Sequence, residues 1–289
     1  MDSKINTVFD GAREIRNKRI VLSEKMLSYI SELSEVLIDE AGEDEIFFKD
    51  PSFISRYRSL TELEGKGNVA HFNQNDVNTV EKQLNETEKA LLCLRMAEIL
   101  GINGIEGSGT FFDDPPKASG ETVSCVKSRL TNDAYIAFAS EMSSPRVSYE
   151  HDINEVCQSV LYGKTAYGIL PLSNAVALFP KYGLKTAKRV RITGQDGSVT
   201  VFALVKKDLD IPSSTSKAHF EFTLKTDHPS KILLAAEACS MTVESISYSS
   251  ENQSLSVTVK ISEDGFCGFL TYLSLNHPDY IPIGIFEEI

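Results

Sequence analysis

The chain has 289 residues, a formal net charge of −12 at neutral pH and a pI near 5.0. This length allows two or three domains with packed cores. The acidic balance argues against a nucleic-acid ligand, which needs a basic face, and a small anionic ligand would need a local cluster of Lys or Arg. No stretch approaches the about 18 to 20 apolar residues of a membrane helix, and the N-terminus lacks the pattern of a secretion signal. We therefore expect a cytoplasmic protein without a membrane or nucleic-acid partner.

The cysteines are widely spaced and mostly flanked by apolar residues, a pattern typical of reduced, mostly buried thiols and not of a disulfide framework. They are Cys93, Cys125, Cys157, Cys239 and Cys267. The histidines are equally scattered, and none stands at metal-ligand spacing from a cysteine. We therefore predict neither a metal site nor a cofactor.

Two polar stretches rich in Gly, Ser or Pro divide the chain, at residues 104–121 and 207–218. Such stretches mark loops or linkers because they supply turn geometry and bury little apolar surface. They separate a helical segment (1–103), a middle segment (122–206) and a final segment (219–289).

The first segment has apolar residues at spacings of three and four with charged residues between them, which predicts amphipathic helices. Asn75 and Asp76 are expected caps for the last of these helices, and Gly101 stands where it should end. The simplest interpretation is a helical packing or dimerisation module without chemistry. The predicted helices cover residues 5–38, 47–65 and 77–100.

The middle segment alternates the periods of strands and helices, which predicts an α/β layered unit with parallel pairing. Its expected strands are 122–126, 146–149, 166–172, 189–193 and 199–205. Its expected helices are 132–141 and 152–162, the second capped by Asp152.

The final segment has another order of elements within about 70 residues, βαββαβ, which is the split ferredoxin-like motif. Its expected strands are 219–225, 242–248, 254–261 and 280–286, with helices over 229–239 and 265–275. The whole chain is therefore expected to combine α/β and α+β architecture.

Several short motifs occur in the order and spacing of one enzyme family. Residues 153–174, with the Gly163 break and Pro171, resemble the "F-x-x-V-x-x-G-x-A-D-Y-G-V-x-P-I-E-N" block of prephenate dehydratase. Residues 182–184 and the strands after them resemble the end of its first lobe. The βαββαβ segment resembles the ACT domain that follows this enzyme and binds phenylalanine. The resemblance covers residues 122–289 and implies a periplasmic-binding-protein-like lobe followed by an ACT domain.

The resemblance implies a set of catalytic residues. Thr200 stands where the family has its catalytic threonine, and Asn174 and Ser173 stand where it has Asn and Glu. Prephenate dehydratase expels a ring hydroxyl as carbon dioxide leaves, so the Thr200 hydroxyl would donate a proton or hydrogen bond to the departing oxygen. Asn174 would orient the substrate, and Phe202 would contact it. The alternative is that Thr200 and Asn174 are an ordinary strand threonine and turn residue.

The two carboxylates of prephenate need cationic or N–H partners in a water-poor site. Lys127 and Arg129, and by position also Arg189, are the expected cations. The sequence departs from the family here, because Val201 replaces the arginine that follows the threonine. The second lobe that normally lies between the two motif blocks also has no counterpart, so one wall of the substrate cleft is expected to be missing.

A second expected site opens the first helix of the ACT-like segment. Asp227, His228 and Ser230 precede or begin this helix, whose free N–H groups suit an amino-acid carboxylate. Glu244 stands where the family has the Glu of a Glu-Ser-Arg motif. The alternative is that Asp227 is only a helix cap and the domain only dimerises.

Three functions remain open from the sequence. The first is a catalytically degenerate relative of prephenate dehydratase that binds an aromatic amino acid through its ACT domain. The second is an active dehydratase acting on prephenate, or a bifunctional chorismate mutase and prephenate dehydratase. The third is an interaction protein. In each case a homodimer through the ACT or helical segment is expected. The mutase's pattern of Arg, Lys and Gln is not found in the sequence, although the first helix carries Arg13, Arg16, Arg19 and Lys25. A solvated helix face explains these four basic residues equally well.

Overall fold

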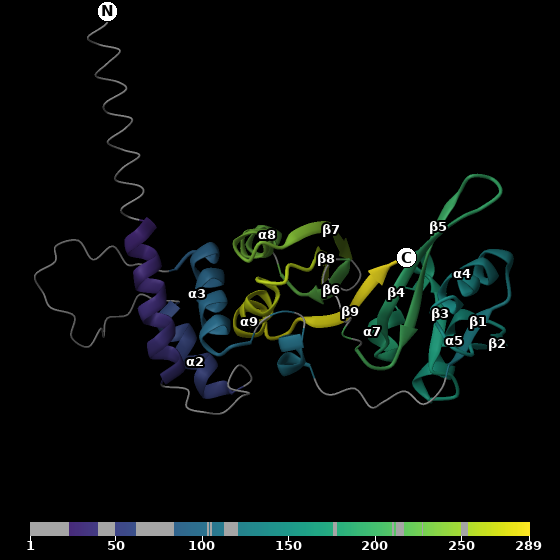
Figure 1. Cartoon of the computed structure of the whole chain (residues 1–289), viewed down its shortest axis with the longest axis horizontal. Helices are drawn as coiled ribbons and strands as arrows, with labels where there is room; N and C mark the ends of the chain where they lie inside the picture. Colours follow the sequence, from purple (N-terminus) through teal and green to yellow (C-terminus); the bar gives the residue numbers. More distant parts are fainter. Residues whose placement is uncertain are drawn as a thin grey trace, which may run out of the picture.

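The computed structural model describes residues 23–39, 50–61, 84–102, 104, 106–112, 121–175, 178–209, 211, 217–226, 228–249 and 254–289. The described helices of the first segment lie at one end of the molecule, and the first three strands lie at the other (Figure 1). Six positions discussed above lie outside the described residues: Arg13, Arg16, Arg19, Asn75, Asp76 and Asp227.

All described strands belong to one sheet of order β2-β1-β3-β5-β4-β9-β6-β8-β7. The middle segment supplies β1 (Thr122–Val126), β2 (Arg146–Glu150), β3 (Tyr167–Pro171), β4 (Lys185–Thr193) and β5 (Val199–Lys206). The final segment supplies β6 (Ala218–Leu224), β7 (Thr242–Ser249), β8 (Ser254–Lys260) and β9 (Ile281–Glu288). The predicted mixed α/β class is confirmed.

The middle segment forms a three-layered lobe. β1 pairs in parallel with β2 and β3, as predicted, while β4 and β5 form an antiparallel hairpin. Helix α4 (Arg129–Ala139) packs in one cluster with Val123 and Phe202, and helix α5 (Ile153–Leu161) packs in another with Leu170 and Val205. Since neighbouring strand residues point to opposite faces, the two helices cover opposite faces of the sheet.

Gly168 explains how closely α5 approaches β3. A Cβ at this position would lie 2.9 Å from Val156 and 3.0 Å from Val160 of α5. Two short helices, α6 (Leu172–Ala175) and α7 (Leu178–Tyr182), follow β3 and lead into β4.

The final segment has the predicted βαββαβ order, with α8 (Pro229–Ala238) and α9 (Phe266–Asn276) between its strands. We call residues 218–289 the C-terminal module. Phe220 and Phe222 of β6 contact Phe266 and Phe269 of α9, with ring centroids 5.5 and 5.9 Å apart. The alternate β6 residues, His219 and Glu221, therefore point to the opposite face of the sheet.

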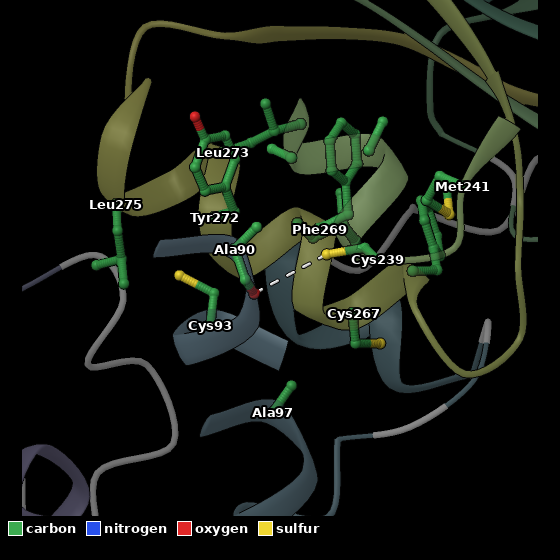
Figure 2. Close-up of a cluster of buried hydrophobic side chains, with 14 of the residues drawn as sticks. Ala90, Cys93, Ala97, Cys239, Met241, Cys267, Phe269, Tyr272, Leu273 and Leu275 are labelled. Atoms are coloured by element: carbon green, nitrogen blue, oxygen red, sulfur yellow. Dashed lines mark hydrogen bonds between the residues drawn. The ribbon is translucent and has the colours of Figure 1, made fainter. Parts of the chain in front are cut away.

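The N-terminal helices are part of the same core as the C-terminal module. Residues 23–39 form a helix, followed by α2 (Pro51–Thr61) and α3 (Glu86–Ile99). Helix α3 packs on α8 and α9, and Figure 2 shows Ala90, Cys93 and Ala97 facing Cys239 and Cys267. A Cβ at Gly268 of α9 would lie 2.7 Å from the Leu94 Cα, so the two helices meet there at backbone distance.

The predicted helix over 77–100 begins later than expected. Residues 84 and 85 are not helical, and Asn85 caps α3 in a capping box with Glu88. The residue pattern Asn-x-x-Glu could have located this start, whereas the predicted caps at 75 and 76 lie outside the described residues. The predicted end is confirmed, since Gly101 follows the C-cap with φ of +68°.

The first predicted linker is packed in part. Residues Glu106–Phe111 form a 3₁₀ helix, η2, and Phe111 is buried against the C-terminal module. Phe112 lies 6.3 Å from Phe220 between ring centroids. The segment that leads from the helices to the lobe therefore also contributes to the core, although its composition resembles a linker.

The lobe and the C-terminal module meet where β4 and β9 pair in parallel. Gly284 of β9 allows this contact, because a Cβ there would lie 2.4 Å from the Thr186 carbonyl oxygen. Arg189 of β4 reaches past β9 to form a buried ion pair with Glu221, and its guanidinium lies 3.9 Å from the centre of the Phe286 ring. Backbone pairing and side-chain contacts thus both join the lobe to the C-terminal module.

Among the described residues, no helix is both long and apolar enough to cross a membrane. In the same part of the chain, no group of three or more His, Cys, Asp or Glu is placed to hold a metal ion.

Candidate functional site

The carboxyl ends of the parallel strands form one edge of the lobe. β1 ends at Val126 opposite Glu150 of β2, and β3 ends at Pro171. Helices α4, α5 and α6 all begin at this edge, directly after the three strands. In open α/β sheets, ligands bind at the carboxyl ends of the strands. We call this region the carboxyl edge.

Thr200 lies at the same edge, although its strand runs the other way. Phe202 of β5 pairs with Pro171, the last residue of β3, so Thr200 projects beyond the end of β3. Thr200 is half-buried and pairs with Ile192 across the β4–β5 hairpin. It shares the strand face of Phe202 and Leu204, which pack with α4. Its hydroxyl is therefore on the α4 side of the carboxyl edge.

The two expected cations flank the start of α4. Lys127 and Arg129 are exposed on either side of Ser128, which caps α4 by accepting a hydrogen bond of 3.1 Å from the Thr131 N–H. The Lys127 Nζ lies 5.6 Å from the centre of the Tyr149 ring. Both cations thus stand at a helix N-terminus, whose partial positive charge adds to theirs.

The neighbouring helix α5 starts differently. Its cap is Asp152, which accepts a hydrogen bond of 2.9 Å from the Glu155 N–H. This carboxylate already neutralises the N-terminus of α5, so an anion at the carboxyl edge is favoured at α4 and disfavoured at α5.

Ser173 and Asn174 belong to α6, which begins at the carboxyl edge after Pro171. Ser173 is exposed, and only the backbone of Asn174 is described. The sequence therefore identified five residues that the fold brings to one edge, namely Thr200, Ser173, Asn174, Lys127 and Arg129. That they act on a substrate stays a prediction.

Two further residues proposed for substrate contact lie in the protein interior. Phe202 is 3% exposed and packs in the hydrophobic cluster beneath α4. It therefore supports the carboxyl edge through core packing and does not face solvent there. Arg189, a candidate cation by position, is not at the carboxyl edge. Its guanidinium is buried against Glu221 and Phe286 at the junction with the C-terminal module.

Sequence reasoning missed the charged cluster at this junction. His219 stacks on Phe286 with centroids 5.4 Å apart, and its Nε2 lies 3.1 Å from a Glu244 carboxylate oxygen. Burial raises the pKa of Glu221 above its ordinary value, although Arg189 opposes this. The alternation of His219 and Glu221 with buried phenylalanines in β6 was a usable sign, because a charged residue on a covered sheet face needs a partner.

The second expected site is divided by the structure. His228 is the N-cap of α8 but makes no side-chain cap hydrogen bond, and Ser230 is exposed in the first turn. Glu244 instead lies near the start of β7, beside His219 at the start of β6. Because α8 follows the far end of β6, Glu244 is a strand length away from His228. Among the three described residues of this set, the fold brings together His228 and Ser230 and separates Glu244 from them.

The five cysteines are free and buried, which confirms the predicted burial. Burial raises the pKa of Cys125 and Cys157 to about 11 and that of Cys239 and Cys267 to about 12. Since the thiolate is the reactive form, these thiols are poor nucleophiles near neutral pH.

No family model matches the chain, and no curated protein matches it. Among solved structures, it is similar to prephenate dehydratase from Streptococcus mutans, with 12% identity and a TM-score of 0.46 over 58% of this chain and 99% of that chain. It is also similar to prephenate dehydratase from Arthrobacter aurescens in complex with L-Phe, with 9% identity and a TM-score of 0.45 over 57% of this chain and 90% of that chain. A third similar structure is GqqA, described as a novel type of quorum quenching acylase. The identity is 12% and the TM-score is 0.45, over 58% of this chain and 96% of that chain. Such low identities and TM-scores do not decide an activity, which has to be argued from this chain's own residues.

Proposed function

We propose that the protein is a prephenate dehydratase-like binding protein that takes a small carboxylate of the aromatic amino-acid class and does not turn it over. The observation that carries this proposal is the exposure of Lys127 and Arg129 at the same carboxyl edge of the lobe as Thr200. These groups suit recognition of an anion, and their exposure does not suit a reaction that requires a dry site.

The charge distribution supports an anionic ligand. Residues 122–206 carry ten Lys and Arg against six Asp and Glu, a formal charge of +4 in a chain of −12. Lys127, Arg129 and the N-terminus of α4 concentrate positive charge at the carboxyl edge. An otherwise acidic protein therefore offers an anion one favourable region.

The side chains at the carboxyl edge support binding without turnover. Thr200 has a hydroxyl to donate, but Val201 follows it, and the Arg189 guanidinium is occupied by Glu221. Among the described residues, no wall lies over Ser173, Lys127 and Arg129, which are exposed. Water would stay in contact with a bound anion and weaken each electrostatic interaction with it.

The test measures binding and turnover on the same full-length preparation. Calorimetry with prephenate should show binding that weakens about tenfold or more in Lys127→Ala/Arg129→Ala, the effect of losing charge-assisted contacts. Lys164→Ala is the matched control, because Lys164 is exposed before β3, at the other end of the strands. Its affinity should equal that of the unmodified chain.

Turnover distinguishes the alternatives. Phenylpyruvate formation that disappears in Thr200→Ala would establish an active dehydratase and refute the proposal. Absence of both turnover and binding, for prephenate and for L-phenylalanine, would leave the interaction protein as the answer. L-phenylalanine binding that is insensitive to Lys127→Ala/Arg129→Ala would move the ligand site to the start of α8.

A further inference from the structure

Tyr149 presents an exposed aromatic ring at the carboxyl edge of the lobe. It is the next-to-last residue of β2, it pairs with Cys125 of β1, and it is 47% exposed. Phe202, to which the sequence assigned contact with a substrate, is buried and cannot offer its ring to a ligand. An apolar group that covered Tyr149 would remove apolar surface from water and lower the free energy.

Two contacts hold the Tyr149 ring in place. Its hydroxyl donates a hydrogen bond of 3.4 Å to the Asn132 side-chain oxygen of α4, and the Lys127 Nζ lies over the ring, 5.6 Å from its centre. Because Cys125 packs in the cluster beneath α4, its partner Tyr149 lies on the α4 face of the sheet. The ring is therefore fixed beside the first turns of α4, at the margin of the lobe that β2 forms (Figure 1).

The cations beside this ring have no counter-charge. Neither Lys127 nor Arg129 forms an ion pair within the part of the chain that the structure describes. In contrast, Lys188, Arg189 and Arg191 of the same lobe each pair with a glutamate. The N-terminus of α4 adds partial positive charge. A carboxylate is the group that this arrangement lacks.

One small molecule can satisfy both features. The 5.6 Å between the Lys127 Nζ and the centre of the Tyr149 ring is comparable to the reach of a carboxylate on a short chain from a benzene ring. Two aromatic rings prefer an offset contact with centroids about 4.5 to 7 Å apart. An arylalkyl carboxylate can therefore stack on Tyr149, while the flexible Lys127 side chain leaves the ring and turns to the carboxylate.

This arrangement lies away from Thr200. β1 and β3 separate β2 from β5 in the sheet, which amounts to three strand spacings of about 4.8 Å, or roughly 14 Å in all. A small ligand with its ring on Tyr149 and its carboxylate on Lys127 does not cross this distance to the Thr200 hydroxyl. Its position therefore agrees with binding that leaves the ligand chemically unchanged.

We propose that Tyr149 selects the ligand of this site, and that Tyr149, Lys127 and Arg129 together bind an arylalkyl carboxylate. This inference rests on the proposed function, since it names the ligand class and the residue that recognises it. Tyr149 supplies the ring contact that the sequence assigned to Phe202. An aliphatic carboxylate of the same length meets the same cations but loses the stacking contact, so the site discriminates against it.

Paired ligands test the ring contact on the full-length protein. Calorimetry with 3-phenylpropionate and 3-cyclohexylpropionate compares two acids that differ only in the aromaticity of the ring. The unmodified chain should bind the aromatic acid about fivefold more tightly, which is a typical contribution of aromatic stacking. Tyr149→Leu should lose this preference. Tyr149→Phe keeps the ring without the hydrogen bond to Asn132 and should retain the preference.

Tyr162→Leu is the matched control. Tyr162 is 72% exposed at the end of α5, so it lies at the opposite end of the strands from Tyr149. This variant should bind both acids as the unmodified chain does.

The outcomes separate this inference from the proposed function. Equal affinities of the unmodified chain for the two acids, or a preference that survives in Tyr149→Leu, would overturn the inference alone. Binding of prephenate without binding of 3-phenylpropionate would have the same meaning. If the unmodified chain bound neither acid, nor prephenate, nor L-phenylalanine, the proposed function would fail and this inference with it.

Discussion

Helices α9 and α4 have the same length but opposite surroundings. Nine of the eleven residues of α9 are buried, against three of the eleven residues of α4. Helix α4 covers one face of the lobe and exposes its other side, whereas α9 lies between the sheet and α3. A helix that is apolar all round needs partners on all sides, so the N-terminal helices complete the C-terminal module.

This difference assigns separate roles to the two ends of the molecule. The lobe keeps its carboxyl edge, with Lys127 and Arg129, in contact with water, as a binding site requires. The C-terminal module buries most of its large apolar side chains within the chain. Its exposed ones lie on α8 and β7 and at Ile281 and Ile289. Three substitutions would break or sharpen this contrast.

The largest effect is expected where α3 meets α9. Gly268→Leu would place side-chain atoms against the backbone of Leu94 and force the two helices apart. We expect a loss of about 3 kcal/mol in the free energy of unfolding, at the upper end for overpacking a core. Urea unfolding followed by circular dichroism measures it.

The control for this variant is Gly109→Ala. A Cβ at Gly109 meets nothing within 4 Å, and the residue has no left-handed backbone conformation. Its unfolding midpoint should match that of the unmodified chain. If Gly268→Leu also left the midpoint unchanged, α3 and α9 would not be packed as described.

An intermediate effect is expected at the junction of the lobe with the C-terminal module. Glu221→Gln would leave the buried Arg189 guanidinium without its ion-pair partner. We expect a cost of about 2 kcal/mol, less than for an isolated buried charge, because Glu288 and Glu244 still act on Arg189. Replacing both residues by Met should recover most of this loss, because an apolar pair needs no desolvation of charge. Thermal and urea unfolding of the single and double variants measure the difference.

An exposed ion pair between β4 and β9 gives the comparison. Arg191 and Glu288 lie 3.1 Å apart with side chains 68% and 36% exposed. Glu288→Gln should cost less than about 1 kcal/mol, as surface pairs do. Equal losses in Glu221→Gln and Glu288→Gln would mean that burial of the Arg189 pair contributes nothing.

The elements of the lobe and of the C-terminal module were predictable because local patterns determine them. Alternation in residues 254–260 and the cap at Asp152 locate a strand and a helix without long-range information. The join between β4 and β9 was not predictable, since it depends on Gly284 meeting Thr186 across about 100 residues of chain. The packing of α3 on α9 was missed for the same reason, although the predominantly apolar composition of α9 indicated a missing partner.

The candidate site was predictable in its position but not in its surroundings. Parallel strand order brings Lys127 and Ser173 to one edge, and the start of the antiparallel strand β5 adds Thr200. The separation of Glu244 from His228 follows from strand direction within the βαββαβ unit, which a motif alignment ignores. The burial of Arg189 depends on a partner in the other module, which no local pattern identifies.

The smallest effect concerns pH and the end of α9. His277 follows α9, and its Nε2 is buried without a hydrogen-bond partner among the described residues. Burial lowers the pKa of His277 below 6.5; Glu86 and Asp279 oppose this shift, and Lys231 and Lys89 add to it.

The sign of the pH effect follows from this direction. Between the lowered folded-state pKa and the unfolded value near 6.5, the unfolded chain binds more protons than the folded chain. The free energy of unfolding therefore rises with pH in this window and falls as the pH drops through it, by less than about 1.4 kcal/mol per pH unit. Melting temperatures between about pH 5 and pH 8, where histidine titrates, should fall more steeply on acidification for the unmodified chain than for His277→Gln. Parallel curves would show that His277 is as well solvated in the folded protein as in the unfolded chain.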